Sequence, residues 1–245
     1  MKKLFVLMMI AAMALTACKK DPKPSPKPID DGGDDKEYVA PITIDGDFAD
    51  WAKLDASKVI TLTSNANAAK KALKVAKIYA DAAALFVYVE FDAAMITWSN
   101  VEGEEEWVPF HLYFDADNST TTGGFNGEQW TDGGFDALFE GFLTDGNGLA
   151  AYDPGVYAWN GEVGGNAWAW DVDSPLATGG VCSGAGKDNK YEIMMLRDMY
   201  PGELADPFVL GIDIQQGWST VGYLPNTDAE AEPNKVPGVL VKANK

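Results

Sequence analysis

Apolar and polar residues alternate with a period of two over much of the chain after residue 40. Residues 85–91, 110–115 and 191–196 each place apolar side chains at every second position, and residues 208–214 and 236–241 are apolar runs of strand length. Successive side chains of a β-strand point to opposite faces, so this pattern predicts strands. The Gly-, Asp- and Asn-rich segments between them predict turns; these are residues 80–82, 123–124, 133–134, 145–148 and 164–166.

One segment also allows a helix. Ala and Lys dominate residues 66–77, which makes Ala66–Lys77 the single helix candidate of the sequence. Its second half, Lys74–Tyr79, can instead form a strand that pairs with residues 85–91 through a turn at Asp81. Short strands separated by regular turns are typical of an all-β fold. The sequence therefore predicts a single-domain antiparallel β-sandwich of the jelly-roll or immunoglobulin-like kind.

The N-terminus has the layout of a secretory signal. Two lysines precede an apolar run over residues 4–15, which is too short to span a bilayer as a mature helix. The following residues 15–18, Leu-Thr-Ala-Cys, resemble the lipobox of bacterial lipoproteins. That resemblance implies a signal peptide over residues 1–17 and acylation of Cys18, which would anchor the mature protein stably to a membrane. The alternative is an ordinary signal peptide that ends near a cysteine.

A tether is expected to follow the lipidated cysteine. Residues 18–38 are rich in Pro and Asp and contain almost no apolar side chains. Prolines at alternate positions favour an extended polyproline II conformation, which suits a spacer. We therefore assign residues 39–245 to the sandwich domain.

Composition and charge exclude several functions. The chain of 245 residues has 19 Lys and Arg against 37 Asp and Glu, for a formal net charge of -18. This balance disfavours binding to nucleic acid and to anionic lipid surfaces. One His and two Cys leave no His/Cys zinc site and no CxxC pair, and Ser-His-Asp or Cys-His catalysis would have to use His111. On its strand pattern, His111 is expected to be a surface residue or one whose hydrogen bonds are satisfied, and Cys182 a small buried residue.

Acidic residues are concentrated in the middle of the chain. Between Lys77 and Lys187 the sequence has no Lys or Arg and 18 carboxylates. Such a block either faces solvent or gathers around divalent cations. Asp115, Asp117 and Asn118 place three oxygen-bearing side chains within four residues, next to a Gly-Gly pair, and form the candidate Ca²⁺ site. The alternative is an Asx-turn between two strands.

Several tryptophans lie in Gly-rich or acidic segments, where some rings are expected to be exposed. The C–H face of a sugar stacks on an aromatic plane, while nearby carboxylates accept hydrogen bonds from its hydroxyl groups. Trp168 and Trp170 would share a face if their segment were a strand. The alternative for each ring is a place in the core. The candidate glycan-binding residues are Trp98, Trp107, Trp130, Trp159, Trp168 and Trp170.

The segment Ile42–Trp51 reads Ile-Thr-Ile-Asp-Gly-Asp-Phe-Ala-Asp-Trp, and we interpret it as structural. Gly46 allows a tight turn there, Asp47 and Asp50 can accept hydrogen bonds from backbone amides, and Trp51 has the size to fill the edge of the sandwich.

Taken in order, these segments resemble a known family. The sequence is similar to carbohydrate-binding module family 9 and the related DOMON-like sandwiches over about residues 40–215. The segments that carry the resemblance are 42–51, 78–81, 85–89, 111–118, 122–124, 134–141 and 166–170.

The resemblance implies a family-9-like β-sandwich, and some members of the family bind sugars without catalysis while others bind haem. Our leading prediction is a non-enzymatic, glycan-binding lipoprotein of the cell envelope. It would sit on the outer membrane, surface-exposed or facing the periplasm, contact the membrane through its lipid alone, and supply envelope transporters or hydrolases. The alternatives are a protein-interaction module without a sugar site, a haem-binding domain and a glycosidase, which would need two suitably spaced carboxylates.

Overall fold

Strands form most of the regular structure in the part of the chain that can be described. The computed structural model describes residues 38–95, 107–125, 129–131, 133–145, 149–231 and 235–245. The predicted signal peptide, Cys18 and the tether lie outside these residues, as does Trp98. Residues 38–245 cluster as one compact unit. Short 3₁₀ helices occur in it at η1 (Phe48–Ala52), η2 (Ala56–Lys58), η3 (Ala93–Met95) and η4 (Arg197–Met199).

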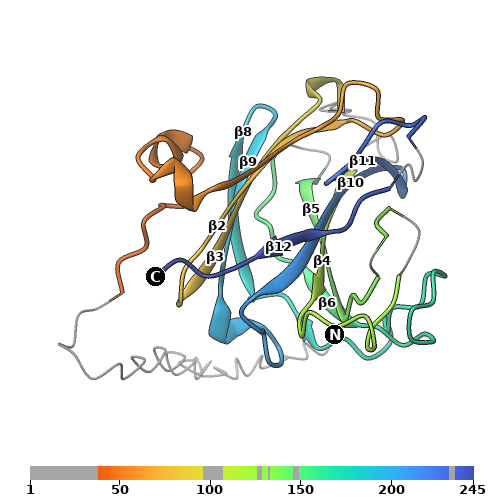
Figure 1. Cartoon of the computed structure of the whole chain (residues 1–245). Coiled ribbons are helices and arrows are strands. Elements are labelled where there is room, and N and C mark those ends of the chain that lie inside the picture. The colour runs from red at the N-terminus through yellow and green to blue at the C-terminus, as the bar shows by residue number, and fades with distance from the viewer. Residues whose placement is uncertain (1–37, 96–106, 126–128, 132, 146–148, 232–234) are drawn as a thin grey trace, which may run out of the picture. The chain divides into compact units, whose positions relative to one another are not determined.

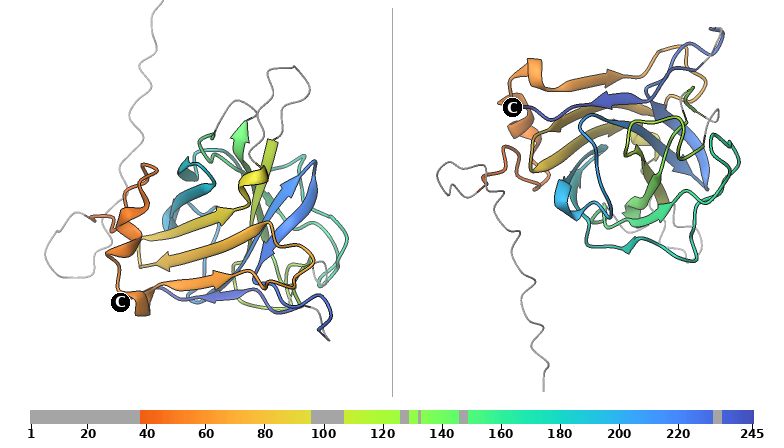
Figure 2. Two further views of the ribbon diagram at one scale, coloured as in Figure 1. Left: turned by 90° about the horizontal axis from the view of Figure 1, so that it is seen from above. Right: turned by 60° about the horizontal axis from the view of Figure 1, so that its bottom comes forward.

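The strands are arranged in two antiparallel sheets, which Figure 1 shows as separate layers. The first sheet has the order β1-β2-β3-β9-β8, and Figure 2 shows β1, β2 and β3 side by side. Its strands are β1 (Ile60–Thr63), β2 (Leu73–Ala80), β3 (Ala84–Phe91), β8 (Cys182–Lys187) and β9 (Lys190–Leu196).

The second sheet has the order β11-β10-β4-β5-β6-β7, and β12 pairs with the first half of β10. Its strands are β4 (Trp107–Asp115), β5 (Ala137–Asp145), β6 (Gly155–Ala158), β7 (Ala177–Thr178), β10 (Phe208–Gln216), β11 (Ser219–Leu224) and β12 (Val239–Val241). The predicted all-β antiparallel sandwich is therefore confirmed.

The main core lies between the two sheets, and the period-two pattern determines which side chains enter it. The odd-numbered positions of residues 85–91 and the even-numbered positions of residues 110–114 belong to one buried cluster. The alternate positions of both strands face outward, where separate buried clusters cover them. Both faces of β3 and β4 are therefore buried, which explains why these strands are apolar almost throughout.

The helix predicted over Ala66–Lys77 is wrong, and the strand alternative is confirmed. Residues 73–80 form β2, which pairs with β3 through the turn at Asp81. The Asp81 carboxylate accepts hydrogen bonds from the amides of Ala83 and Ala84, which closes this turn. Tertiary pairing outweighs the helix propensity of the Ala- and Lys-rich sequence.

The segment Ile42–Trp51 packs on the outer face of the first sheet instead of filling its edge. Trp51 is buried there against β3, and its indole Nε1 donates to Glu192 of β9 over 3.1 Å. The other carboxylate oxygen of Glu192 accepts the amides of Asp45 and Gly46. Gly46 has a φ of 79°, a value that favours glycine. The segment is structural, as the sequence indicated.

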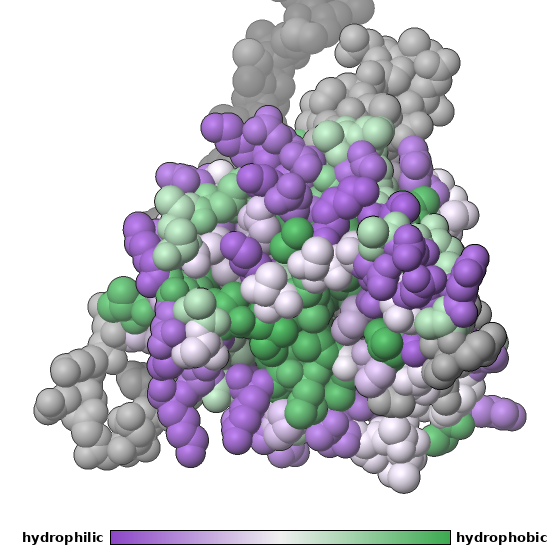
Figure 3. All heavy atoms as spheres, turned by 45° about the horizontal axis from the view of Figure 1, so that its top comes forward, coloured by the Kyte–Doolittle hydropathy of each residue, from purple (hydrophilic) through white to green (hydrophobic). Residues whose placement is uncertain are grey.

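Figure 3 shows one face of the molecule, on which apolar side chains gather near the middle within a largely hydrophilic surround. Across the described ranges, none of the helices has the length and hydropathy needed to cross a bilayer.

Candidate functional site

Three neighbouring strands place ionisable side chains in a row on the outer face of the second sheet. His111 of β4 lies directly opposite Asp213 of β10 on one side and Glu140 of β5 on the other. Residues directly opposite each other in antiparallel strands point to the same face, so the three side chains meet. His111 Nδ1 is 2.9 Å from Asp213 Oδ1, and Nε2 is 3.2 Å from Glu140 Oε2.

This row is buried and strongly coupled. His111 and Asp213 are both fully buried, whereas the Glu140 side chain is 18% exposed. Burial alone would lower the pKa of His111, but the charges and hydrogen bonds of Asp213 and Glu140 outweigh it and raise that pKa to about 9. His111 is therefore a cation at neutral pH. Its two ring nitrogens each lie close to a carboxylate.

Polar side chains from three other positions hold the Asp213 carboxylate. Its Oδ2 accepts from Gln129 Nε2 at 2.7 Å, from Thr220 Oγ1 at 3.1 Å and from the Tyr113 hydroxyl at 3.3 Å. Gln215 Nε2 also donates to Asp213 Oδ2, over 3.5 Å. These contacts offset the cost of burying an ion pair.

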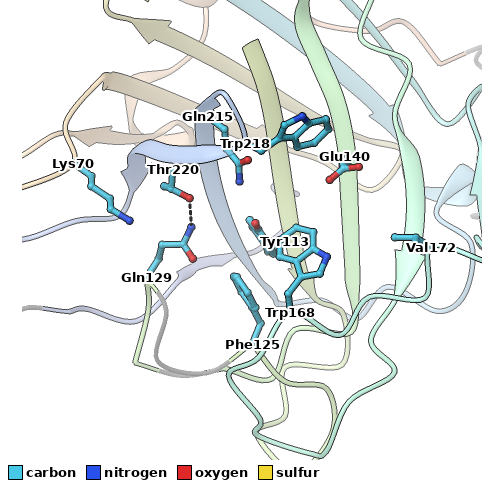
Figure 4. A pocket seen from close by; sticks show the side chains of 10 residues that line it. All are labelled: Lys70, Tyr113, Phe125, Gln129, Glu140, Trp168, Val172, Gln215, Trp218 and Thr220. Carbon is cyan, nitrogen blue, oxygen red and sulfur yellow. Dashed lines mark hydrogen bonds between the residues drawn. The ribbon is translucent and has the colours of Figure 1, made fainter. Parts of the chain in front are cut away.

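Glu140 and the polar side chains that surround Asp213 line the floor of a pocket, which we call the outer-face pocket. Figure 4 shows its lining side chains gathered around one space, with Gln129 hydrogen-bonded to Thr220. Its volume is about 570 Å³, within the range of small-molecule sites. Trp168 and Trp218 line it with 51% and 62% of their surface exposed. The lining residues are Lys70, Tyr113, Phe125, Gln129, Glu140, Trp168, Val172, Gln215, Trp218 and Thr220.

Two of the aromatic lining residues have left-handed backbones. Phe125 has a φ of 64° and Trp218 a φ of 61°. Bulky side chains rarely adopt this region, which costs about 1–2 kcal/mol for a residue with a Cβ. The other non-glycine residues with positive φ in the described part are Asn118 and Asp188, types that tolerate it. Backbone strain of this kind clusters at ligand sites.

The pocket also offers hydrogen-bond acceptors. Gln129 is buried, with only 5% of its surface exposed, yet its Oε1 has no hydrogen-bond partner among the described residues. A buried acceptor without a partner costs free energy unless a ligand or water donates to it. With the partly exposed Glu140 carboxylate, the floor presents acceptors beneath aromatic walls. That arrangement can bind a ligand with apolar faces and hydroxyl donors.

The predicted tryptophans divide into exposed and buried rings. Trp168 is in the pocket, and Trp107 is 48% exposed on the same face of the sheet. Trp130 and Trp170 are buried in the cluster beside Tyr113, so neither ring is presented to a ligand in this conformation.

Trp159 is half-buried against Trp170, with a centroid separation of 5.2 Å. Trp168 and Trp170 do not lie in a strand, so the condition under which they would share a face is not met. They lie in a loop, one exposed and one buried.

Sequence reasoning missed several lining residues. Trp218 was not among the candidate residues. Gly217 and Trp218 form the two-residue connection between β10 and β11. A two-residue connection between strands is the signal that would have located it. Phe125 and Gln129 come from the long connection between β4 and β5, whose path the sequence does not determine.

The acidic loop forms a second cluster. Asp115, Asp117 and Asp136 have carboxylate oxygens within 4.8 Å of one another. Asp115 ends β4 and Asp136 precedes β5, and these antiparallel neighbours bring the two ends together. Burial, together with the charges of Asp136 and Asp117, raises the pKa of Asp115 to about 7. Asn118 is exposed beside them.

Local hydrogen bonds already engage this cluster. Asp115 accepts the amide of Ser119, Asp136 accepts that of Ala116, and Thr122 donates to Asp117. These bonds close the loop, but none of them joins an Asp side chain to the amide two residues on, as an Asx-turn does. The calcium site stays a prediction.

Cys182 is half-buried and has a free thiol. Burial raises its pKa well above the usual range, which keeps the thiol protonated and unreactive.

Comparison with known proteins gives no family assignment. No family model matches the sequence, and no curated protein matches it either. The class of the protein is therefore defined by its own fold and site: an antiparallel β-sandwich with an aromatic-walled pocket on the outer face of one sheet.

Proposed function

We propose that this protein binds a glycan, without catalysis, in the outer-face pocket. The observation that carries the proposal is the combination of exposed aromatic walls with a floor of hydrogen-bond acceptors. Trp168 and Trp218 offer planes on which the C–H face of a sugar ring stacks, while Gln129 and Glu140 accept hydrogen bonds from its hydroxyl groups. A protein-interaction module without a sugar site would have no need for this combination.

The charge of the site favours a neutral glycan. Among the described residues, Lys70 and Glu140 are the charged side chains that line the pocket, and their charges are opposite. The remainder of the domain is strongly acidic, with 12 basic and 31 acidic residues from position 38 onward. Its field repels anionic polysaccharides. A neutral saccharide approaches the domain without this electrostatic repulsion.

The cellular setting is proposed from the N-terminal sequence. Acylation of Cys18 and an extended tether over residues 18–38 would hold the sandwich away from the lipid of the outer membrane. From there, on the surface or in the periplasm, the domain would retain a glycan for envelope transporters or hydrolases.

The test is calorimetric titration of the 38–245 domain with neutral xylan, glucomannan, mixed-linkage β-glucan and starch. We expect one of them to bind, and Trp168→Ala to weaken that binding at least tenfold. The matched control is Leu240→Ala, which removes an exposed apolar side chain from β12, at the other end of β10 from Trp218. Polygalacturonate should not bind. If no polysaccharide binds, or if Trp168→Ala leaves binding unchanged, the proposed site is wrong.

A further inference from the structure

Aromatic side chains continue along the outer face of the second sheet beyond the pocket. Phe142 lies one row further along the sheet from Glu140, opposite Pro109, and Trp107 lies at the start of β4. The Phe142 ring is 4.8 Å from that of Trp107 and 5.8 Å from that of Trp218, with interplanar angles of 78° and 83°. We call Trp107, Phe142 and Trp218 the aromatic platform.

The platform is exposed and continuous with the pocket. Trp107 is 48% and Trp218 62% exposed, and Trp218 belongs to both features. Most proteins bury rings of this size, and neighbouring exposed aromatic residues mark interaction surfaces. The left-handed backbone of Trp218 follows from the two-residue turn between β10 and β11, which requires positive φ.

The opposite end of the same face is closed. There, Tyr113 stacks on Phe125 at 5.1 Å, and Trp130, Phe135 and Trp170 are buried around it. A ligand that fills the pocket and is longer than it cannot extend in that direction. In the other direction, exposed rings continue from Trp218 to Trp107 by way of Phe142.

We propose that the ligand is an oligosaccharide several units long, with one unit in the outer-face pocket and the following units on the aromatic platform. This inference rests on the proposed function and specifies its ligand. Neighbouring platform rings lie 4.8 and 5.8 Å apart and meet edge to face, so a sugar chain that crosses the platform would contact the exposed parts of Trp218 and Trp107 in turn. The pocket gives selectivity through its polar floor, and the platform adds affinity that grows with chain length.

The experiment is a chain-length series. The domain is titrated calorimetrically with xylo-, cello-, manno- and malto-oligosaccharides of one, two and six units, using the unaltered protein and the variants Trp107→Ala, Trp168→Ala and Leu240→Ala. For the series that binds, we expect the six-unit sugar to bind at least tenfold more tightly than the single unit. Trp107→Ala should weaken six-unit binding about 3- to 10-fold and leave single-unit binding unchanged. Trp168→Ala should weaken both.

The outcomes separate the two proposals. If the single unit and the six-unit sugar bind equally, or if Trp107→Ala changes neither affinity, the platform inference is overturned while the pocket stands. If no sugar of any length binds, both are overturned. Sedimentation of the domain is run alongside. If the unaltered protein self-associates and Trp107→Ala abolishes that association, the platform is an interface between copies and the inference also fails. Thermal unfolding shows whether each variant is folded.

Discussion

Replacing Trp218 with asparagine should remove a ligand contact at almost no cost in stability. The ring is 62% exposed, so somewhat more than a third of its surface is buried. A tryptophan buries about 150–250 Å² when fully enclosed. Removing a third of that area costs about 1.5–2 kcal/mol at about 25 cal/mol per Å².

Relief of backbone strain should offset that loss. Gly217 and Trp218 both have positive φ in the two-residue turn between β10 and β11. Such a turn favours Asn and Gly, and the left-handed region costs other residues about 1–2 kcal/mol. We therefore expect Trp218→Asn to leave the free energy of unfolding within about 1 kcal/mol of the unaltered protein. Trp218→Ala, which keeps most of the strain, should be about 1 kcal/mol less stable than Trp218→Asn.

Urea unfolding of the three proteins measures these differences, and titration with the bound glycan measures the function. Both variants should lose about tenfold or more in affinity. The usual cost of deleting a core tryptophan is about 3–5 kcal/mol. A loss above about 2 kcal/mol for Trp218→Asn would therefore show that Trp218 is a packing residue, and retained affinity would show that it does not contact the ligand.

Three further predictions concern buried charge. Because the pKa of His111 is raised to about 9, protonated His111 stabilises the folded protein fully below pH 6.5, and this stabilisation is lost as the pH rises through 9. The unfolding free energy of the unaltered protein relative to His111→Gln should therefore fall by about 3 kcal/mol over this window. Urea unfolding at several pH values measures this difference, and a constant difference would contradict the prediction. The pKa of Asp115 is raised to about 7, so ionisation of Asp115 destabilises the fold increasingly from pH 4 to 7. In chelator, Asp115→Asn should therefore raise the melting temperature at pH 7.5 but not at pH 4. Under the calcium prediction, Ca²⁺ raises the melting temperature of the unaltered protein but not of this variant, and no shift with Ca²⁺ would count against the ion site. Trp51→Phe leaves the fully buried carboxylate of Glu192 without its indole donor. Chemical unfolding should show a free energy of unfolding that is lower by about 2–3 kcal/mol, with no change in glycan affinity. A change in affinity would assign the segment Ile42–Trp51 a role in binding.

Much of the fold could be predicted from local pattern. The alternation in residues 85–91 and 110–115 correctly assigned strands and their inward faces, because the side-chain period of a strand is a local property. The Ala- and Lys-rich residues 66–77 were ambiguous for the same reason, since local propensity favours helix while pairing with β3 imposes a strand. The structural role of Ile42–Trp51 could also be predicted from the sequence, because turn residues and a single large ring are strong local signals.

Only part of the candidate site could be predicted from the sequence. The sequence singled out Trp168 and Trp107 by their Gly-rich or acidic surroundings, but the same reasoning chose Trp130, which is buried. Whether a ring in a long loop is exposed depends on how that loop folds over the sheet, and nothing local specifies that path. The sequence by itself determined an acidic β-sandwich that is rich in aromatic residues.

The tertiary structure alone decided where those residues meet. His111, Asp213 and Glu140 are far apart in the sequence, and only the register of β10, β4 and β5 brings them into one row. The same register aligns Phe142 with the turn that carries Trp218. Strand register is set by the packing of whole sheets and by turn geometry, so it is a global property. A pocket built across four strands therefore becomes visible only once the sheets have formed.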